Sequence, residues 1–153
     1  MKLDSNAFVG EEPLVSALES HSMPLDCSAG RVLFRQDQSP DGLYIVIDGE
    51  VALTMRSPTG ELVMDLPAQP GSLLGLPALV GGGVYSLAAI AQPGAQVGFV
   101  PRDEFARLML SEPGIAAMIL KVLAAEVRTA RMAAADLKAR EAAALQQLES
   151  QVH

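Results

Sequence analysis

Residues 43–53 have the sequence LYIVIDGEVAL, in which two apolar runs are separated by the dipeptide Asp48-Gly49. Asp-Gly readily adopts the positive φ angles of a two-residue hairpin turn. In the second run, which continues to Arg56, large apolar residues alternate with small or polar ones, so one face is expected to be buried. This pattern predicts two neighbouring strands joined as a β-hairpin.

Further short strands are expected at close, even spacing on the C-terminal side of this hairpin. The turn residues SPTG, 57–60, precede a partner strand at 61–66, and Pro-Gly at 93–94 separates runs at 84–91 and 96–100. Pro and Gly occupy these turns because they supply the backbone angles that tight reversals need. Many short strands of this kind predict an antiparallel roll or barrel rather than a parallel sheet with crossover helices.

From Pro101 onward the pattern becomes helical. Residues 102–110 fit a short helix with acids in its first turn, and residues 115–150 contain no Gly or Pro and favour a helix of about nine turns. Residues on this long helix are spaced alternately by four and three, as in a heptad repeat. We expect them to form a dimer interface of Leu123, Val127, Ala130, Ala134 and Leu137. The alternative is packing along the chain's own roll, but a helix of this length would overhang it.

The length of 153 residues suits a single core with one added helix. We therefore expect an α+β fold: an antiparallel, jelly-roll-like β-roll with short flanking helices and a long C-terminal dimerisation helix. The roll and its flanking helices are assigned to residues 1–110, and the long helix to residues 111–153.

Charge is unevenly distributed along the chain. Residues 1–100 contain four Lys/Arg against eleven Asp/Glu, and the remainder contains seven of each. Neither part has the basic stripe of a nucleic-acid-binding surface, so we expect no DNA binding by this chain alone. No apolar run approaches the roughly 18 residues of a membrane span, and the acidic N-terminus is unlike a signal peptide. The expected location is cytoplasmic, with no membrane partner.

Metal and catalytic chemistry are not supported by the residues available. The histidines are His21, which precedes the roll strands, and the terminal His153, so no His-ligated metal or haem site is expected inside the roll. A lone Cys27 can form neither an internal disulfide nor an iron–sulfur site. The serines have no nearby histidine to activate them. We expect a non-enzymatic protein without cofactors.

The order of elements resembles the cyclic nucleotide-binding domain of the catabolite activator and fumarate-nitrate regulator family. Residues 29–53 are similar to the opening strands of that family, and residues 105–120 to its hinge into the dimerisation helix. Glycines and small residues also match its phosphate-binding cassette, at Gly71, Gly75, Ala78 and Leu79. The resemblance covers about residues 14–140 and implies a homodimer paired through the long helix. It includes no helix-turn-helix segment.

Key polar positions of the cassette differ from the family pattern. Nucleotide-binding members use a Glu for the ribose hydroxyl and an Arg before a Ser or Thr for the cyclic phosphate, where this chain has Leu76 and Tyr85 before Ser86. Losing the guanidinium removes a charge-assisted partner, and Pro77 removes one backbone N–H from the cradle. Ordinary cyclic AMP recognition is therefore not expected.

Two alternatives for the cassette stay open from the sequence. In the first, a less anionic small molecule binds in a regulatory or sensor module, with Arg131 entering from the long helix. Its candidate site consists of Gly75, Leu76, Ala78, Leu79, Tyr85, Ser86 and Arg131. In the second, the chain's own side chains fill the pocket, and the protein is a dimerisation or interaction scaffold that acts on a protein partner, for example full-length relatives. A true cyclic nucleotide site with an atypical pocket is the remaining alternative.

Overall fold

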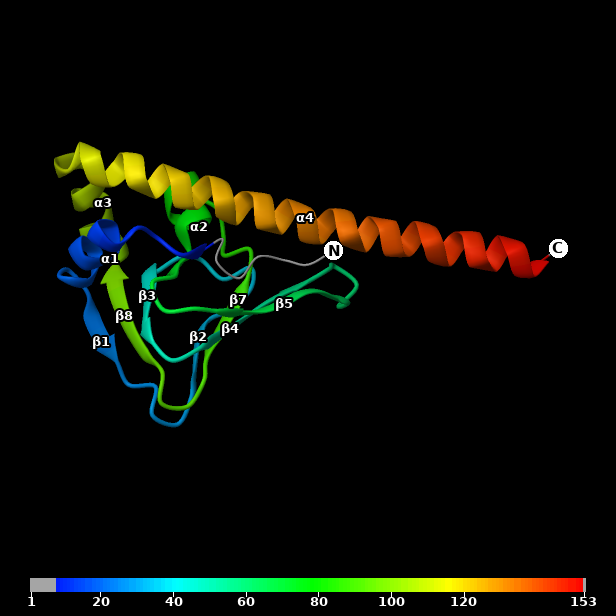
Figure 1. Cartoon of the computed structure of the whole chain (residues 1–153), viewed down its shortest axis with the longest axis horizontal. Coiled ribbons are helices and arrows are strands. Elements are labelled where there is room, and N and C mark those ends of the chain that lie inside the picture. The colour runs from blue at the N-terminus through cyan, green and yellow to red at the C-terminus, as the bar shows by residue number, and fades with distance from the viewer. Residues whose placement is uncertain (1–7, 153) are drawn as a thin grey trace.

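The computed structural model describes residues 8–152 and has the predicted α+β architecture (Figure 1). Two four-stranded antiparallel sheets form the roll. The first has the order β1-β8-β3-β6, with β1 Met23–Leu25, β8 Gln96–Pro101, β3 Gly42–Asp48 and β6 Leu73–Leu74. The second has the order β2-β7-β4-β5, with β2 Arg31–Phe34, β7 Ala88–Ala91, β4 Val51–Arg56 and β5 Leu62–Ala68.

Four helices accompany the sheets in the described part of the chain, and they are α1 Glu12–Glu19, α2 Leu76–Gly81, α3 Arg102–Ser111 and α4 Pro113–Val152. On the longer helices, apolar residues recur every three or four positions and so form one face, because residues at this spacing lie above one another on a helix. This face packs against the first sheet. The pairs Leu14 and Leu18 in α1 and Phe105 and Leu108 in α3 are buried in this way. The helices thus form a third layer over the first sheet.

Strand β3 lies between both hydrophobic clusters of the molecule. Leu43 and Ile45 point into the cluster shared with the helices, whereas Tyr44 and Val46 point into the roll interior. Successive side chains on a strand point to opposite faces, so a strand covered on both sides needs an uninterrupted apolar sequence. This explains why LYIVI shows no polar alternation.

The predicted hairpin at Asp48-Gly49 is wrong. Strand β3 pairs with β6 and β8, whereas β4 pairs with β5 and β7, so the turn carries the chain from one sheet to the other. Gly49 has the expected positive φ of 81°, and a Cβ there would lie 2.8 Å from Ala95 Cα. The turn chemistry therefore predicted the reversal correctly but could not specify which strands pair.

The other strand predictions differ in outcome. The turn at 57–60 does join a hairpin, β4–β5, closed by a hydrogen bond from the Ser57 amide to the Glu61 carbonyl (2.8 Å). The strand expected at 84–91 is wrong in its first half, because β7 begins only at Ala88. Residues 84–87 instead turn into the roll, where Tyr85 and Leu87 are buried.

Helix α4 packs along the roll for about two thirds of its length and then extends beyond it (Figure 1). Ile119 and Val122 are buried against the helical layer, and Ala133 is 1% exposed in the interior cluster of the roll. Arg140 Nη1 lies 3.9 Å from Glu61 Oε1 at the tip of the β4–β5 hairpin. From residue 141 to residue 151 every position is exposed.

Among residues 8–152, no single helix is long and apolar enough to cross a membrane. Within the same residues, one pair of helical segments, α3 and residues 113–125 of α4, is together long and apolar enough to span a membrane. The axes of the two segments are bent by 117° at the break between them. Both of them supply buried side chains to the helical layer, such as Phe105 and Ile119.

Candidate functional site

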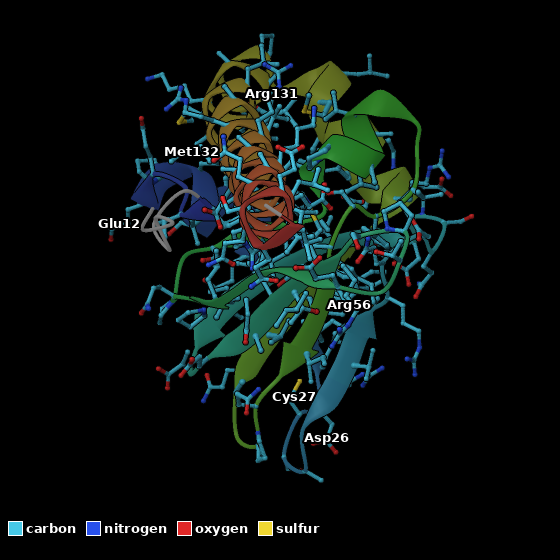
Figure 2. The ribbon with its side chains drawn as sticks, turned by 90° about the vertical axis from the view of Figure 1, so that its right-hand side faces the viewer. Glu12, Asp26, Cys27, Arg56, Arg131 and Met132 are labelled. Carbon is cyan, nitrogen blue, oxygen red and sulfur yellow. The ribbon has the colours of Figure 1, made fainter. Side chains whose placement is uncertain are left out.

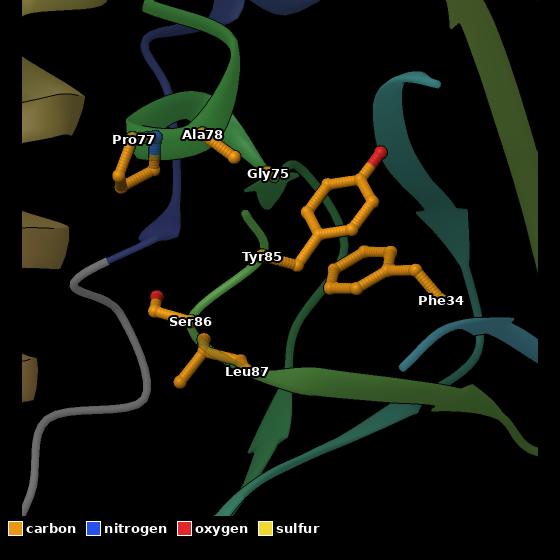
Figure 3. A pocket seen from close by; sticks show the side chains of 7 residues that line it. All are labelled: Phe34, Gly75, Pro77, Ala78, Tyr85, Ser86 and Leu87. Carbon is orange, nitrogen blue, oxygen red and sulfur yellow. The ribbon is translucent and has the colours of Figure 1, made fainter. Parts of the chain in front are cut away.

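The cassette, residues 71–87, contains helix α2, which follows β6 and precedes β7 along the chain. Helix α2 lies above the side chains of Tyr85 and Phe34 (Figure 3). Gly75 immediately precedes α2 with a φ of 101°, a backbone conformation that residues with a Cβ rarely adopt. A Cβ at this position would also lie 2.8 Å from Tyr85 Cε1. Gly75 is therefore required both by its backbone angle and by the closeness of the Tyr85 ring.

Tyr85 occupies the interior of the cassette. Its side chain is 1% exposed, and its ring stacks on Phe34 of β2 with centroids 4.0 Å apart and an angle of 20° between the planes. Figure 3 shows the two rings side by side beneath α2. The aromatic pair fills the centre of the cassette with apolar carbon.

The Tyr85 hydroxyl is fully satisfied within the protein. It lies 2.7 Å from both Asp41 Oδ1 and the Gly42 carbonyl oxygen, so its single proton is shared between two acceptors. The same oxygen accepts hydrogen bonds from the amides of Asp41 (3.1 Å) and Gly42 (3.2 Å). The hydroxyl is thus anchored at the beginning of β3.

The backbone of Tyr85 is held as firmly as its side chain. The Asp37 amide donates to the Tyr85 carbonyl (2.8 Å), and the Tyr85 amide donates to the Gln38 carbonyl (2.9 Å). Asp37 has a φ of 71°, an uncommon value for a residue other than Gly. The loop between β2 and β3 therefore encloses residue 85, and this pairing diverts residues 84–87 from the strand predicted there.

Two buried phenols share one carboxylate in this region. Tyr44 donates its hydroxyl hydrogen to Asp41, at 3.1 Å from each carboxylate oxygen. Burial, followed by the nearby Asp41 charge, raises the pKa of Tyr44 well above its usual value, and burial with the hydrogen bond to Asp41 does the same to the pKa of Tyr85. Both phenols therefore remain protonated at neutral pH and act as hydrogen-bond donors to Asp41.

The space left in the cassette is very small. The cavity there has a volume of about 10 Å³, close to the minimum that a single water molecule needs. Its lining consists of Phe34, Gly75, Pro77, Ala78, Tyr85, Ser86 and Leu87 (Figure 3).

The structure brings together four of the seven candidate ligand-binding residues, and these are Gly75, Ala78, Tyr85 and Ser86. Leu76 and Leu79 instead face the helical cluster on the other side of α2. Arg131 is exposed on α4, on the side away from the sheets (Figure 2), and it does not line the cavity. A ligand-binding role for these residues stays a prediction.

Two important residues were missed by sequence reasoning. Phe34 and Asp41 both contact Tyr85 but were not among the candidate residues named from the sequence. The available signal was the dipeptide Asp41-Gly42 directly before an apolar strand, which places a carboxylate at a strand entry. Its partner, Tyr85, is 44 residues away, so no local pattern could have joined them.

The predicted dimer interface lies on α4. Leu123, Val127 and Leu137 are partly exposed and Ala134 is exposed, while the side chain of Ala130 lies outside the described residues. Leu120, three residues before Leu123, is 56% exposed and extends the same stripe. Beyond the roll, Leu145 and Leu148 are 61% and 59% exposed. Leu123 packs partly against the helical cluster, so the apolar surface that α4 leaves uncovered is mainly that of Leu120, Leu145 and Leu148.

Cys27 lies at the end of the roll far from α4 (Figure 2). It is 3% exposed, and burial raises the pKa of its thiol. No group of three His, Cys, Asp or Glu side chains within the described residues is placed to hold a metal ion.

Known proteins share this fold and sequence pattern. Residues 24–112 match the family model of the cyclic nucleotide-binding domain. A CRP-like cAMP-activated global transcriptional regulator of Mycobacterium tuberculosis is 28% identical over 131 residues, which are 85% of this chain and 58% of the relative. The HTH-type transcriptional regulator Cmr of the same organism is 33% identical over 129 residues, covering 80% and 52% of the two chains.

A solved structure, the catabolite activator protein of Thermus thermophilus, superposes with a TM-score of 0.68 at 24% identity, over 84% of this chain and 60% of that one. The chain spans only 52% to 58% of the length of the curated relatives named above. The matched segment, residues 24–112, contains the roll, the closed cassette and α3. The chain belongs to the cyclic nucleotide-binding domain family.

Proposed function

We propose that this chain is a regulatory module of the cyclic nucleotide-binding domain family whose cassette is closed by its own Tyr85. In this proposal the module acts as a homodimer through α4 and performs no catalysis. The observation that carries it is the cavity of about 10 Å³, since sites for small ligands generally need about 300–1,000 Å³. The ring that fills this space is stacked on Phe34 and has a satisfied hydroxyl.

A second argument concerns charge. The cassette lining contains no Arg or Lys side chain, so a cyclic phosphate there would lack a cationic partner. Desolvating an anion without such a partner is costly. The cassette therefore disfavours cyclic nucleotides both by its volume and by its chemistry.

Titration calorimetry with cyclic AMP and cyclic GMP tests the closed cassette. The M. tuberculosis cAMP-activated regulator serves as the positive control under the same conditions. We expect no saturable heat and no rise in melting temperature for this chain, because a ligand that binds only the folded state would stabilise it. Micromolar binding of either nucleotide would overturn the proposal.

Dimerisation is tested by Val127→Glu, which places a charge at a partly exposed position in the middle of the predicted interface. Ala135→Glu is the matched control, because Ala135 is exposed on a different face of the same helix. Sedimentation should give a dimer for the parent chain and for Ala135→Glu, and a monomer for Val127→Glu. A dimer for all three would show that another surface carries assembly.

A small-molecule sensor is the second candidate, and one observation favours it: Ser86 is exposed and contributes to the lining of the cavity. A ligand would have to displace the Tyr85 ring to gain volume. Soaking with a panel of uncharged metabolite-sized compounds, followed by thermal shift, separates this candidate from the closed module.

A further inference from the structure

Asp41 contacts three separate parts of the fold. Its carboxylate accepts hydrogen bonds from the hydroxyls of Tyr85 and Tyr44, and its amide donates to the Tyr85 oxygen. Its carbonyl oxygen accepts a hydrogen bond of 3.0 Å from the amide of Arg102, the first residue of α3. Asp41 therefore connects the cassette, the beginning of β3 and the beginning of the helical layer.

Helix α3 is well placed to pass on any change at Asp41. It continues through a single residue, Glu112, into α4. Leu76 of α2, Phe105 of α3 and Ile119 of α4 belong to one buried cluster. Because tightly packed elements move together, a shift at the first turn of α3 would change how α4 sits on the roll.

We infer that Tyr85 acts as a built-in ligand and that Asp41 is the positioning residue that couples it to α3 and α4. This inference rests on the proposed closed cassette and adds a regulatory consequence: the placement of the dimerisation helix is fixed by an internal side chain instead of a bound molecule. The Tyr85 hydroxyl interacts with four polar groups of Asp41 and Gly42 at once. Its removal would take this partner from the buried amide of Gly42 and the partly buried amide of Asp41, and leaving buried donors unpaired is costly.

The test replaces the side chain by a free molecule. Tyr85→Ala empties the ring site, and p-cresol, which has the shape and the hydroxyl of a tyrosine side chain, is the probe. We expect saturable p-cresol binding to the variant by calorimetry and none to the parent chain. Adding Asp41→Ala should reduce the affinity of the variant for p-cresol about tenfold, because a hydrogen bond to a charged group is lost. The affinity for toluene, which lacks the hydroxyl, should change less than about twofold when Asp41→Ala is added.

The coupling itself is measured by amide hydrogen exchange at residues 102–105, which include the Arg102 amide that donates to Asp41. Opening the site with Tyr85→Ala should speed exchange there about tenfold, and p-cresol should restore the parent rate. Leu33→Ala is the control, since Leu33 is 6% exposed in the same interior cluster and makes no side-chain hydrogen bond to Asp41. It should destabilise the protein without a selective effect at the beginning of α3.

Three results would overturn the inference: no p-cresol binding to Tyr85→Ala, equal effects of Asp41→Ala on p-cresol and toluene, or unchanged exchange at residues 102–105. If Tyr85→Ala does not fold, Tyr85→Phe keeps the ring and removes only the hydroxyl, and faster exchange at the same residues is still required. Failure of the proposed function would appear separately, as cyclic nucleotide binding to the parent chain.

Discussion

The cassette, residues 71–87, and the distal segment of α4, residues 141–151, use their apolar side chains in opposite ways. In the cassette, Leu76 and Tyr85 are at most 1% exposed and are packed on both sides of α2. In the distal segment, Leu145 and Leu148 are about 60% exposed, and no residue from 141 to 151 is buried. The cassette thus encloses its apolar side chains, whereas the distal segment of α4 leaves its leucines uncovered.

The largest expected contrast between the two regions is in core packing. Leu76→Ala should destabilise the protein by about 2–5 kcal/mol, because it removes a fully buried side chain and leaves a cavity. Leu145→Ala, the matched control, should stay within about 0.5 kcal/mol. Urea unfolding at one fixed protein concentration measures both, since association makes apparent stability depend on concentration. Equal losses of unfolding free energy in the two variants would show that the cassette and the distal segment of α4 do not differ in packing.

A second test concerns the closeness of Tyr85 to the backbone. Gly75→Ala and Gly60→Ala both place a Cβ at a positive φ, of 101° and 87°, but only the first would meet another side chain, since Gly60 has nothing within 4 Å. Gly60→Ala should cost about 1–2 kcal/mol from backbone strain. Gly75→Ala should cost about 1–3 kcal/mol more from overpacking. Similar melting temperatures would show that the Tyr85 ring moves aside easily.

Alkaline titration probes the buried phenols. Tyr44 and Tyr85 are the two tyrosines of the chain, and both have pKa values raised above the usual value of about 10. Their stabilising effect is fully present below about pH 10 and is lost as pH rises through the folded-state pKa, because the unfolded chain releases its protons first. Tyrosinate absorbance should therefore appear together with loss of circular dichroism, not before it. A signal near pH 10 from folded protein would contradict the closed cassette.

The smallest expected effect is at the last contact between α4 and the roll. Arg140 lies 3.9 Å from Glu61 and 3.5 Å from Asp136, and all three side chains are substantially exposed. Arg140→Ala should reduce stability by less than about 1 kcal/mol, and added salt should diminish the difference. Lys138→Ala is the control on the same helix. A larger loss would mean that this contact positions α4.

Local sequence patterns predicted most of the fold, and the failures have a common physical origin. Apolar patterns and turn residues located β3, β4, β5, β8 and the second half of the strand at 84–91, but not the short strands β1 and β6. Helix-favouring composition located α3 and α4. The pairing of β3 and β4 was wrong because the Asp48-Gly49 turn determines a chain reversal but not the partner strand. Partners are chosen by contacts between residues far apart in sequence.

The same limit applies to the candidate site. The sequence shows Tyr85 where the resemblance implies an Arg, and from this it predicts that phosphate binding is lost. The direction of the Tyr85 side chain could not be predicted, because it depends on Phe34, Asp41 and Gly42, which lie more than 40 residues earlier. The predicted strand at 84–87 failed for this reason, since the backbone of residue 85 pairs with the β2–β3 loop.

The contact at Arg140 has a mechanical consequence for α4. Beyond it, the segment from residue 141 to residue 151 is a free arm of about 17 Å, at 1.5 Å per residue. A rigid arm amplifies rotation, so a tilt of about 10° at Arg140 would displace its tip by about 3 Å. In the proposed dimer, small adjustments of the helix on the roll would thus become displacements large enough to alter which leucines of the two arms meet.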